Sequence, residues 1–200
     1  MNIFIPTKEL VQLCDYSSSP TDFFSHFPSG WDRARGQVIK LETRQSYVES
    51  GNESLDAALS GDLKKSVELI PNTRSCDDEL YDMVAKKRLQ FIRCRSVETP
   101  RSVYLDWELE VYKYNSRAEQ ITCFNYAAVE DFFDQNIQHD FMVFDASFAV
   151  IHNYDQVGEI QGGWFSGDQK VIRSLLANFS FLKANSQDFR WYLDGSRYNQ

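Results

Sequence analysis

The spacing of apolar and polar residues along the chain first predicts strands. Both QVIKLETRQSY (residues 37–47) and QFIRCRSV (residues 90–97), which stops before Pro100, alternate with the two-residue period of a strand. A further strand is predicted for EQITCFNY (residues 119–126). Residues 140–165 (DFMVFDASFAVIHNYDQVGEIQGGWF) have the pattern of three strands joined by short turns, which favour antiparallel pairing.

Helical spacing predicts helices around these strands. The predicted helices are residues 7–16 (TKELVQLCDY), 52–62 (NESLDAALSGD), 75–90 (SCDDELYDMVAKKRLQ), a helix that follows Pro100, 127–136 (AAVEDFFDQN) and 166–186 (SGDQKVIRSLLANFSFLKANS). Ser75 and Ser166 are the expected N-caps of the two long ones. Because helices and strands do not alternate regularly, the sequence predicts an α+β fold: a mixed, largely antiparallel sheet packed by helices, with a C-terminal helix.

The composition supports one folded domain. Of the 200 residues, 42% are hydrophobic and 14% are aromatic. This suits a single domain over residues 1–200, with a helical, aromatic N-terminal segment (residues 1–30) and the main core in residues 31–193. No run of about 18 apolar residues is present to span a membrane, and the first residues lack the regions of a secretory signal. We therefore expect a cytoplasmic protein with no membrane contact.

Negative charge is concentrated in one stretch of the chain. The net charge of −8 argues against direct nucleic-acid binding, which needs clustered lysines and arginines. Between Arg117 and Lys170 there is no Lys or Arg. The acids of this stretch are Glu119, Glu130, Asp131, Asp134, Asp140, Asp145, Asp155, Glu159 and Asp168. They form either a solvated face or a docking surface for a basic protein partner. Glu130, Asp131 and Asp134, on one predicted helix, are the candidate contacts.

Candidate catalytic and metal-binding chemistry is sparse. The four cysteines are Cys14, Cys76, Cys94 and Cys123. They form no CxxC pair and share no ligand spacing with the three histidines, so no metal site and no cofactor are predicted. Asp145 and Asp155 either form an acid–base pair, bind a divalent cation or serve turns, where Asp is common. No P-loop, GxGxxG or HExxH motif occurs, and no catalytic residue is predicted.

Two arginines two residues apart form a separate candidate site. On the predicted strand, Arg93 and Arg95 share one face, whereas Cys94 faces the other way. On the helix that follows, Tyr104 and Glu108 are four residues apart and share a face. The favoured interpretation is a structural network in which one arginine binds Glu108, because buried guanidinium groups need carboxylate partners. The alternative is that the two arginines, with Tyr104 and Glu108, line a pocket that binds a phosphate or carboxylate.

An ordered set of motifs resembles a known family. The motifs are IKLETRQSY, LSGD, RCRSVETPRSVYLDWELEVYKYNSRAEQI, DFMVFD and HNYDQVGEIQGG. Together, over residues 23–193, they resemble a bacterial, largely actinobacterial, family of domains of unknown function that is encoded near helix-turn-helix regulators. The resemblance implies a fold and a genomic setting rather than a reaction.

Two classes of function remain. The first is a non-enzymatic interaction or accessory protein of a bacterial regulatory or toxin–antitoxin-like module. Its acidic surface would dock a basic protein partner, such as a helix-turn-helix regulator. The second is an enzyme or ligand-binding domain, whose Arg-based pocket would take a phosphorylated or carboxylated small molecule. The first is the leading hypothesis because no catalytic motif is present.

Overall fold

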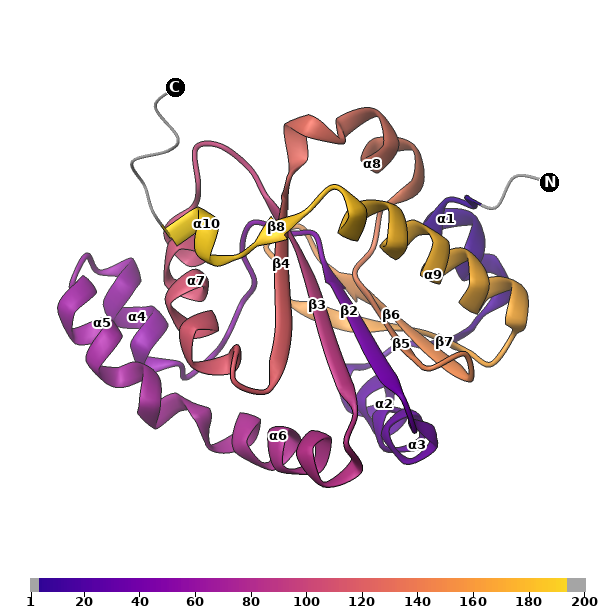
Figure 1. Ribbon diagram of the computed structural model, residues 1–200, viewed down its shortest axis with the longest axis horizontal. Coiled ribbons are helices and arrows are strands. Elements are labelled where there is room, and N and C mark those ends of the chain that lie inside the picture. Colours follow the sequence, from indigo (N-terminus) through magenta and orange to yellow (C-terminus); the bar gives the residue numbers. More distant parts are fainter. Residues whose placement is uncertain (1–3, 194–200) are drawn as a thin grey trace.

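One mixed sheet organises the protein. A computed structural model describes residues 4–193, apart from the side chains of residues 73–77. The strands are β1 (Asp15–Ser17), β2 (Gln37–Glu42), β3 (Gln90–Val97), β4 (Glu119–Asn125), β5 (Phe141–Phe144), β6 (Phe148–Tyr154), β7 (Ile160–Ser166) and β8 (Gln187–Asp188). They form one sheet in the order β1-β7-β6-β5-β2-β3-β4-β8 (Figure 1). β3 pairs in parallel with β2 and β4, and the other neighbours are antiparallel, which confirms the predicted α+β fold.

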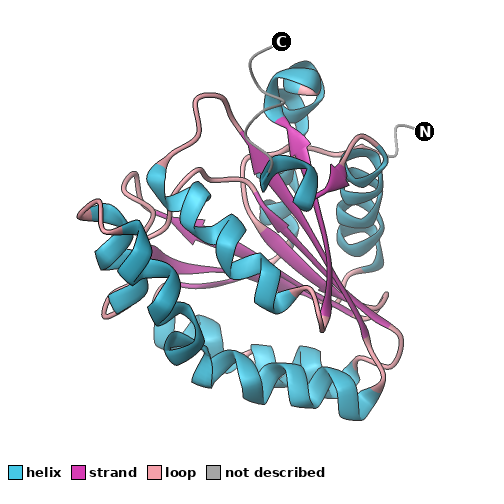
Figure 2. Ribbon diagram, turned by 60° about the vertical axis from the view of Figure 1, so that its left-hand side comes forward, coloured by secondary structure: helices cyan, strands magenta, loops and turns pink. Residues whose placement is uncertain are grey.

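Helices cover both faces of this sheet (Figure 2). The α-helices are α1 (Thr7–Leu10), α2 (Pro20–Ser25), α3 (Phe27–Arg33), α4 (Glu53–Leu59), α5 (Leu63–Leu69), α6 (Ser75–Lys87), α7 (Val103–Asn115), α8 (Glu130–Asn136), α9 (Gln169–Ala184) and α10 (Arg190–Leu193). Short 3-10 helices are η1 (Val11–Leu13), η2 (Ile70–Arg74) and η3 (Tyr126–Ala128). None of the described helices is long and apolar enough to cross a membrane.

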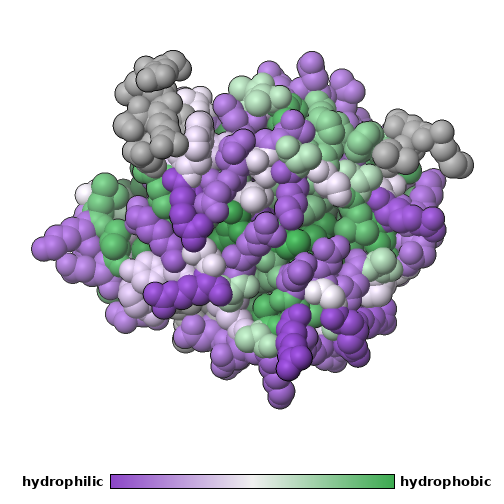
Figure 3. Space-filling model, in the orientation of Figure 1, coloured by the Kyte–Doolittle hydropathy of each residue, from purple (hydrophilic) through white to green (hydrophobic). Residues whose placement is uncertain are grey.

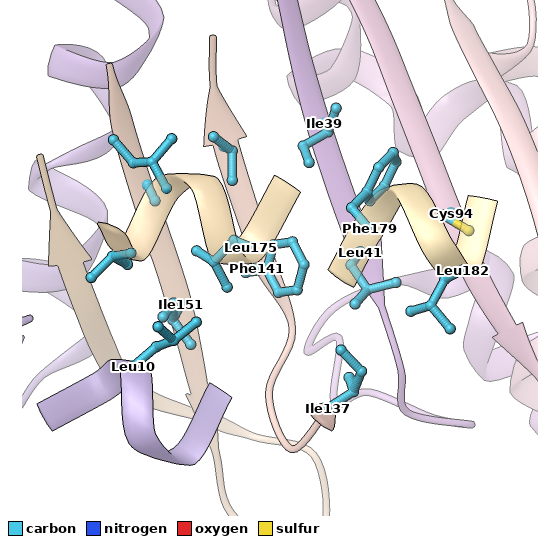
Figure 4. Packing of buried hydrophobic residues seen from close by; sticks show 14 of the residues in the cluster. Leu10, Ile39, Leu41, Cys94, Ile137, Phe141, Ile151, Leu175, Phe179 and Leu182 are labelled. Atoms are coloured by element: carbon cyan, nitrogen blue, oxygen red, sulfur yellow. The ribbon is translucent and has the colours of Figure 1, made fainter. Parts of the chain in front are cut away.

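The α9 face of the sheet is closed by apolar side chains. Leu175, Phe179 and Leu182 of α9 pack against Ile39 and Leu41 of β2 in one buried cluster (Figure 4). All five are nearly or fully shielded from solvent. Complete burial of each of these side chains contributes about 1.5–3 kcal/mol. This face is therefore a conventional hydrophobic core.

The start of α9 corrects one expectation. Asp168, not Ser166, is the N-cap, because its carboxylate accepts hydrogen bonds from the backbone N–H groups of Lys170 and Val171 at 2.6 and 3.2 Å. Ser166 ends β7 instead. The negative charge of an aspartate cap also interacts favourably with the positive end of the helix dipole, and a neutral serine lacks this interaction.

The opposite face is covered by two separate groups of helices. α2, α3 and α6 pack over apolar residues of β2, β3, β5 and β6, whereas α7 packs over the end of β3 and over β4. The helix expected after Pro100 begins at Val103, because the hydroxyl of Ser102 caps it by accepting from the N–H of Leu105 at 3.0 Å. The candidate site lies over β2 and β3, near the middle of the sheet, between α7 and α2.

Several elements were not predicted. Within the N-terminal segment a helix was predicted over residues 7–16 alone, so α2 and α3 were missed, and Phe23 of α2 is fully buried. β1 and β8 are too short, at 3 and 2 residues, to show a strand pattern. Because β1 pairs with β7, the N-terminal segment is part of the sheet. Two sequence predictions, Ser75 as an N-cap and Cys76 as a thiol, lie outside the side chains that the structure describes.

Apolar side chains also reach the surface at one end of the molecule. On α4 and α5, Leu59 and Leu63 are 61% and 62% exposed. Figure 3 shows hydrophobic colouring among hydrophilic residues at this end, on the left. This surface is distinct from the charged site described next.

Candidate functional site: a charged cleft on the face of the sheet

Strands β2 and β3 place four charged side chains on one face of the sheet. Lys40 and Glu42 alternate with apolar residues that face α9, and Arg93 and Arg95 alternate with Cys94 in the same way. As the sequence predicted, Arg93 and Arg95 share this face of β3 and Cys94 lies on the other. Parallel pairing aligns Lys40 with Arg93 and Glu42 with Arg95, so charges of both signs gather on a face that is elsewhere apolar.

Arg93 is held by two carboxylates. Its Nε and Nη2 donate to the two oxygens of Glu119 at 2.7 and 2.8 Å, and its Nη1 donates to Oε1 of Glu42 at 2.6 Å. Burial lowers the pKa of Arg93, but Glu119 and Glu42 outweigh burial and raise this pKa well above its ordinary value. Burial likewise raises the pKa of Glu42, but Arg93 and Lys40 hold it well below its ordinary value. Each side-chain nitrogen of Arg93 therefore has a partner.

Arg95 is fully buried and has one carboxylate partner. Its Nε donates to Oε2 of Glu108 at 2.7 Å, which confirms the predicted pair between a strand arginine and Glu108. The guanidinium carbon lies 5.2 Å from the ring centroid of Tyr47. Within the described residues, Nη1 and Nη2 of Arg95 have no hydrogen-bond partner. Since unpaired buried donors are costly, Arg95 depends strongly on its single carboxylate.

The two predicted residues of α7, Tyr104 and Glu108, bind different partners. The hydroxyl of Tyr104 donates to Oε1 of Glu49, in the loop after β2, rather than to an arginine network. Tyr112, one turn beyond Glu108, donates to Oε2 of Glu42 at 2.9 Å. Glu108 uses one oxygen for its ion pair, whereas its Oε1 has no hydrogen-bond partner among the described residues. One acceptor of Glu108 thus remains available.

The loop after β2 is anchored on two sides. Asp140 accepts hydrogen bonds from the backbone N–H of Thr43 at 2.8 Å, from the Thr43 hydroxyl and from the hydroxyl of Tyr47. On the other side, the N–H of Val48 donates to the carbonyl of Gly158, in the β6–β7 turn, at 3.1 Å. Gly158 has a φ of +93°, and a Cβ there would lie 2.8 Å from a backbone oxygen of the loop. These anchors hold the Tyr47 ring in place.

An open cleft lies over this network. Its volume is about 380 Å³, which is within the range of small-molecule sites. β2 and β3 form the floor, α7 and the loop after β2 form one side, and the β6–β7 hairpin with α2 forms the other. The charged residues that line it are Lys40, Glu42, Glu49, Arg93 and Glu108.

The cleft reaches only some of the predicted ligand-binding residues. Arg93, Tyr104 and Glu108 line it, but Arg95 lies behind the lining and is 0% exposed. Asn115, at the end of α7, also lines the cleft. Its Oδ1 is buried and, in the part of the chain that is described, accepts no hydrogen bond. The binding role of the four predicted residues remains a prediction.

The carboxylates that complete the site were not predicted as part of it. Glu42, Glu49 and Glu119 were not singled out, and neither was Asn115. One signal was available: in QVIKLE the two charged residues share a strand face, and this face carries Val38 of the core. Charges on an otherwise apolar strand face mark a site, because unpaired charges are almost never buried.

Most acids of the stretch without Lys or Arg are used inside the fold. Glu119 and Asp140 are buried in the network. Asp145 accepts from the backbone N–H groups of residues 35–37, and Asp155 accepts from N–H groups of the β6–β7 turn. Asp155 therefore serves its turn, as predicted, whereas the carboxylate of Asp145 joins the β5–β6 turn to the start of β2. Together with Asp168, which caps α9, these acids are committed to structure.

The predicted partner-binding acids remain on the surface. Glu130, Asp131 and Asp134 of α8 are exposed, and Asp134 also accepts from the hydroxyl of Tyr126 at 2.7 Å. Glu159, in the β6–β7 turn, is exposed as well. The acidic surface is thus centred on one short helix rather than spread over the whole stretch.

Other reactive side chains are buried or dispersed. The described residues contain no group of three His, Cys, Asp or Glu that could hold a metal ion. Cys94 faces the α9 core, and burial raises its pKa to about 12. Burial lowers the pKa of His152 to about 3. These two side chains are therefore neutral near pH 7.

Comparison with known proteins places the chain in a family. Residues 25–194 match the model of DUF6879, a domain of unknown function. The chain belongs to this family. The match confirms the unknown-function family that the motifs predicted, over nearly the same residues. None of the curated proteins matches the chain.

A search of solved structures finds distant similarity. One match is the archaeal chromatin protein TrmBL2, whose structure is described as showing a novel mode of DNA binding, with 7% sequence identity and a TM-score of 0.45. The alignment covers 91% of this chain but only 60% of that one. At this level the similarity carries no inference about the present protein.

Proposed function

We propose that this protein is a non-enzymatic binding component of a bacterial regulatory module and that its ligand occupies the charged cleft. The observation that carries the proposal is the open cleft over paired charges on a sheet face. If the paired charges served only to close a core, apolar residues could take their place with little or no loss of stability. Charges that face a cleft instead supply directional contacts for a ligand.

The lining of the cleft favours binding over catalysis. The described residues that line it include no Ser, Cys or His, the side chains that most often act as nucleophile or general base. Its arginine, Arg93, is occupied by Glu119 and Glu42. A simple phosphate clamp formed by Arg93 would have to displace these carboxylates, which disfavours the alternative Arg-based pocket.

The regulatory and bacterial setting rests on the motif resemblance alone. Genes of the resembled family commonly lie near helix-turn-helix regulators, so the bound ligand or partner would affect such a regulator in the cytoplasm. Affinity purification of the full chain from its native cells, followed by identification of bound proteins, tests this setting. If no regulator is recovered, the regulatory setting is refuted, whereas the proposal that the cleft binds a ligand is unaffected.

A cavity-filling variant tests the cleft. Val111→Trp places a large ring in the cleft, because Val111 lines it. Val103→Trp is the matched control, since Val103 lies on the same helix, is 47% exposed and does not line the cleft. A thermal-shift screen of metabolites that span cations, anions and neutral molecules should find a ligand for the parent and the control, but not for Val111→Trp. Ligands that stabilise all three proteins equally would place binding elsewhere and refute the proposal.

A second candidate function is supported by α8. Glu130, Asp131 and Asp134 are exposed on one short helix, within a stretch that has no Lys or Arg. Such a cluster would attract a basic protein partner by long-range electrostatics. The binding should weaken with salt, since the Debye length falls from about 10 Å at 0.1 M to about 3 Å at 1 M.

Amide substitutions test this second candidate. Glu130→Gln, Asp131→Asn and Asp134→Asn together should lower the affinity for any basic partner recovered in a pull-down. The control combines Glu53→Gln, Asp56→Asn and Glu68→Gln, which remove three exposed acids from α4 and α5. A partner affinity that is unaffected by both the α8 variant and salt would show that α8 is only a solvated face.

A further inference from the structure

We infer that the cleft binds a linear polyamine-type cation, with N–H groups near both Glu108 and Asn115. The inference rests on the proposed function, because it requires the cleft to be a binding site. It names a ligand class, which the sequence and the family do not. Four features of the cleft point to this ligand: its charge balance, its unpaired acceptors, its aromatic lining and the spacing of residues along α7.

The charge balance leaves one carboxylate without a cation. Lys40, Arg93 and Arg95 are matched in number by Glu42, Glu119 and Glu108, through contacts of 2.6–2.7 Å. Glu49, which also lines the cleft, has no ion-pair partner among the described residues. Its oxygens accept from the hydroxyl of Tyr104 and from the side-chain amide of Asn52. The cleft therefore carries a net negative charge that a cation would neutralise.

Two unpaired polar atoms at the cleft are acceptors, whereas the unpaired donors nearby, Nη1 and Nη2 of Arg95, lie behind its lining. Asn115 is only 5% exposed, and its buried Oδ1 has no hydrogen-bond partner in the described part of the chain. Oε1 of Glu108 is also unpaired there. A buried acceptor without a donor is destabilising. A ligand that donates N–H groups would satisfy both atoms, whereas a phosphate or carboxylate would satisfy neither.

Aromatic rings complete a site that suits cations. Tyr104, Trp107 and Tyr112 of α7 line one side, and Tyr47 and Tyr154 line the rest. Ring faces attract ammonium and guanidinium groups, most strongly where water is excluded. The fold already uses this contact, since Arg93 lies over the Tyr112 ring and Arg95 over the Tyr47 ring.

The spacing of the acceptors sets the ligand length. Glu108 and Asn115 are seven residues apart on α7, so they share a face and lie about 10 Å apart along the helix axis. A single ammonium group cannot contact both. A linear cation with two or more amino groups contacts both, because its chain and its hydrogen bonds of about 2.9 Å together bridge the two residues. Glu49, which binds the Tyr104 hydroxyl, adds its charge near Glu108.

Binding of spermidine is the direct test. Titration calorimetry on the full chain should detect spermidine. Putrescine, which carries two ammonium groups instead of three, should bind about tenfold more weakly. A neutral diol as long as spermidine should not bind. Inorganic phosphate and succinate are the anionic probes. A trilysine peptide tests whether ammonium groups on a protein bind the cleft in the same way. Tighter binding of the peptide than of spermidine would refute a small polyamine as the ligand.

Matched variants locate the contact. Asn115→Leu and Glu49→Gln should each weaken spermidine binding by about tenfold or more. Asn178→Leu is the control, because Asn178 is also a buried asparagine with an unpaired Oδ1, but it lies on α9 at the opposite face of the sheet. It should bind spermidine as the parent does. Thermal melting of each free variant verifies that it is folded.

The outcomes separate this inference from the proposed function. Binding of the diol or of an anion in preference to spermidine, with loss of binding in Val111→Trp, would overturn the polyamine inference and leave a functional cleft. Equal effects of Asn115→Leu and Asn178→Leu would overturn the role of Asn115. If no probe and no metabolite of the wider screen binds, both proposals fail.

Discussion

The two faces of the sheet bury very different side chains. Against α9, β2 contributes Ile39 and Leu41, and the side chains buried there are mostly apolar, with Ser174 and Asn178 of α9 as polar exceptions. On the other face, the same strand contributes Lys40 and Glu42, which lie over a cleft. One strand thus supplies a hydrophobic core on one side and a charged network on the other. Because β2 closes one face of the sheet with apolar side chains, charged side chains are not needed simply to close the other face.

The energetic basis of the two faces also differs. Apolar burial is non-directional and nearly independent of pH and salt. Buried ion pairs must recover the cost of desolvating both charges, and they do so only while every partner is present. The α9 face should therefore tolerate changes in solution conditions. The charged face should fail abruptly when one partner is removed.

Removal of Glu108 should produce the largest effect. Glu108→Gln leaves the buried guanidinium of Arg95 without its carboxylate, and breaking a buried pair in this way costs about 3–5 kcal/mol. Denaturant unfolding measures the loss. Glu110→Gln is the control, because Glu110 pairs with Lys113 at the surface and exposed pairs contribute about 0–1 kcal/mol. Similar losses in both variants would mean that Arg95 is solvated.

A cavity on the α9 face should be slightly less costly. Leu175→Ala removes a fully buried side chain and should lower the free energy of unfolding by about 2–5 kcal/mol. The loss should be the same at low and high salt, because no charge is involved. Leu59→Ala, at a residue that is 61% exposed, should change stability by about 0.5 kcal/mol or less. A loss from Leu175→Ala that depends on salt would contradict the contrast between the faces.

The apolar face was the easier one to predict. Leu175 and Phe179 repeat at helical spacing and Ile39 and Leu41 at strand spacing, so local periodicity alone indicated that they would be buried. Short elements such as β1 escaped prediction because three residues are too few to show a period. The strand order also depends on contacts between distant segments, which no local pattern contains.

The charged face could be predicted only in part. Arg93, Arg95 and Glu108 are close in sequence, and strand and helix periods were enough to predict that one of the two arginines pairs with Glu108, but not which one. Glu42 and Glu119 reach Arg93 from other strands, so their role depends on the order of strands in the sheet. That the cleft is open depends on where the two groups of helices end, which is a property of the tertiary structure.

His152 should make stability depend on pH. Burial, followed by the charge of Lys40, lowers its pKa from 6.5 to about 3. The folded state therefore keeps His152 neutral, whereas the unfolded chain gains a proton below about pH 6.5. Its contribution to stability is complete above this pH and is lost as the pH falls toward 3, by about 1.4 kcal/mol per pH unit.

A non-titrating variant isolates this effect. The free energy of unfolding of His152→Gln should decline less than that of the parent between pH 6.5 and about 4. Glu42 contributes equally in both proteins, because its lowered pKa removes stability only below about pH 4.5. His26→Gln is the control at a partly exposed histidine. If the pH profiles of the parent and His152→Gln are parallel, His152 is protonated in the folded state.

Replacement of both members of the buried pair should have the smallest effect on stability. Arg95→Met combined with Glu108→Met removes the stranded charge that makes Glu108→Gln costly, and it also removes the desolvation of both groups. Buried pairs replaced by apolar residues of similar volume are often as stable as the original, or more so. We therefore expect the double variant to unfold within about 1 kcal/mol of the parent. It should nevertheless lose affinity for the cleft ligand, because Oε1 of Glu108 is gone. Denaturant unfolding and spermidine titration on the same protein measure the two properties separately. A double variant as unstable as Glu108→Gln would make the pair a structural requirement, and the case that this face was kept charged for binding would lose its main support.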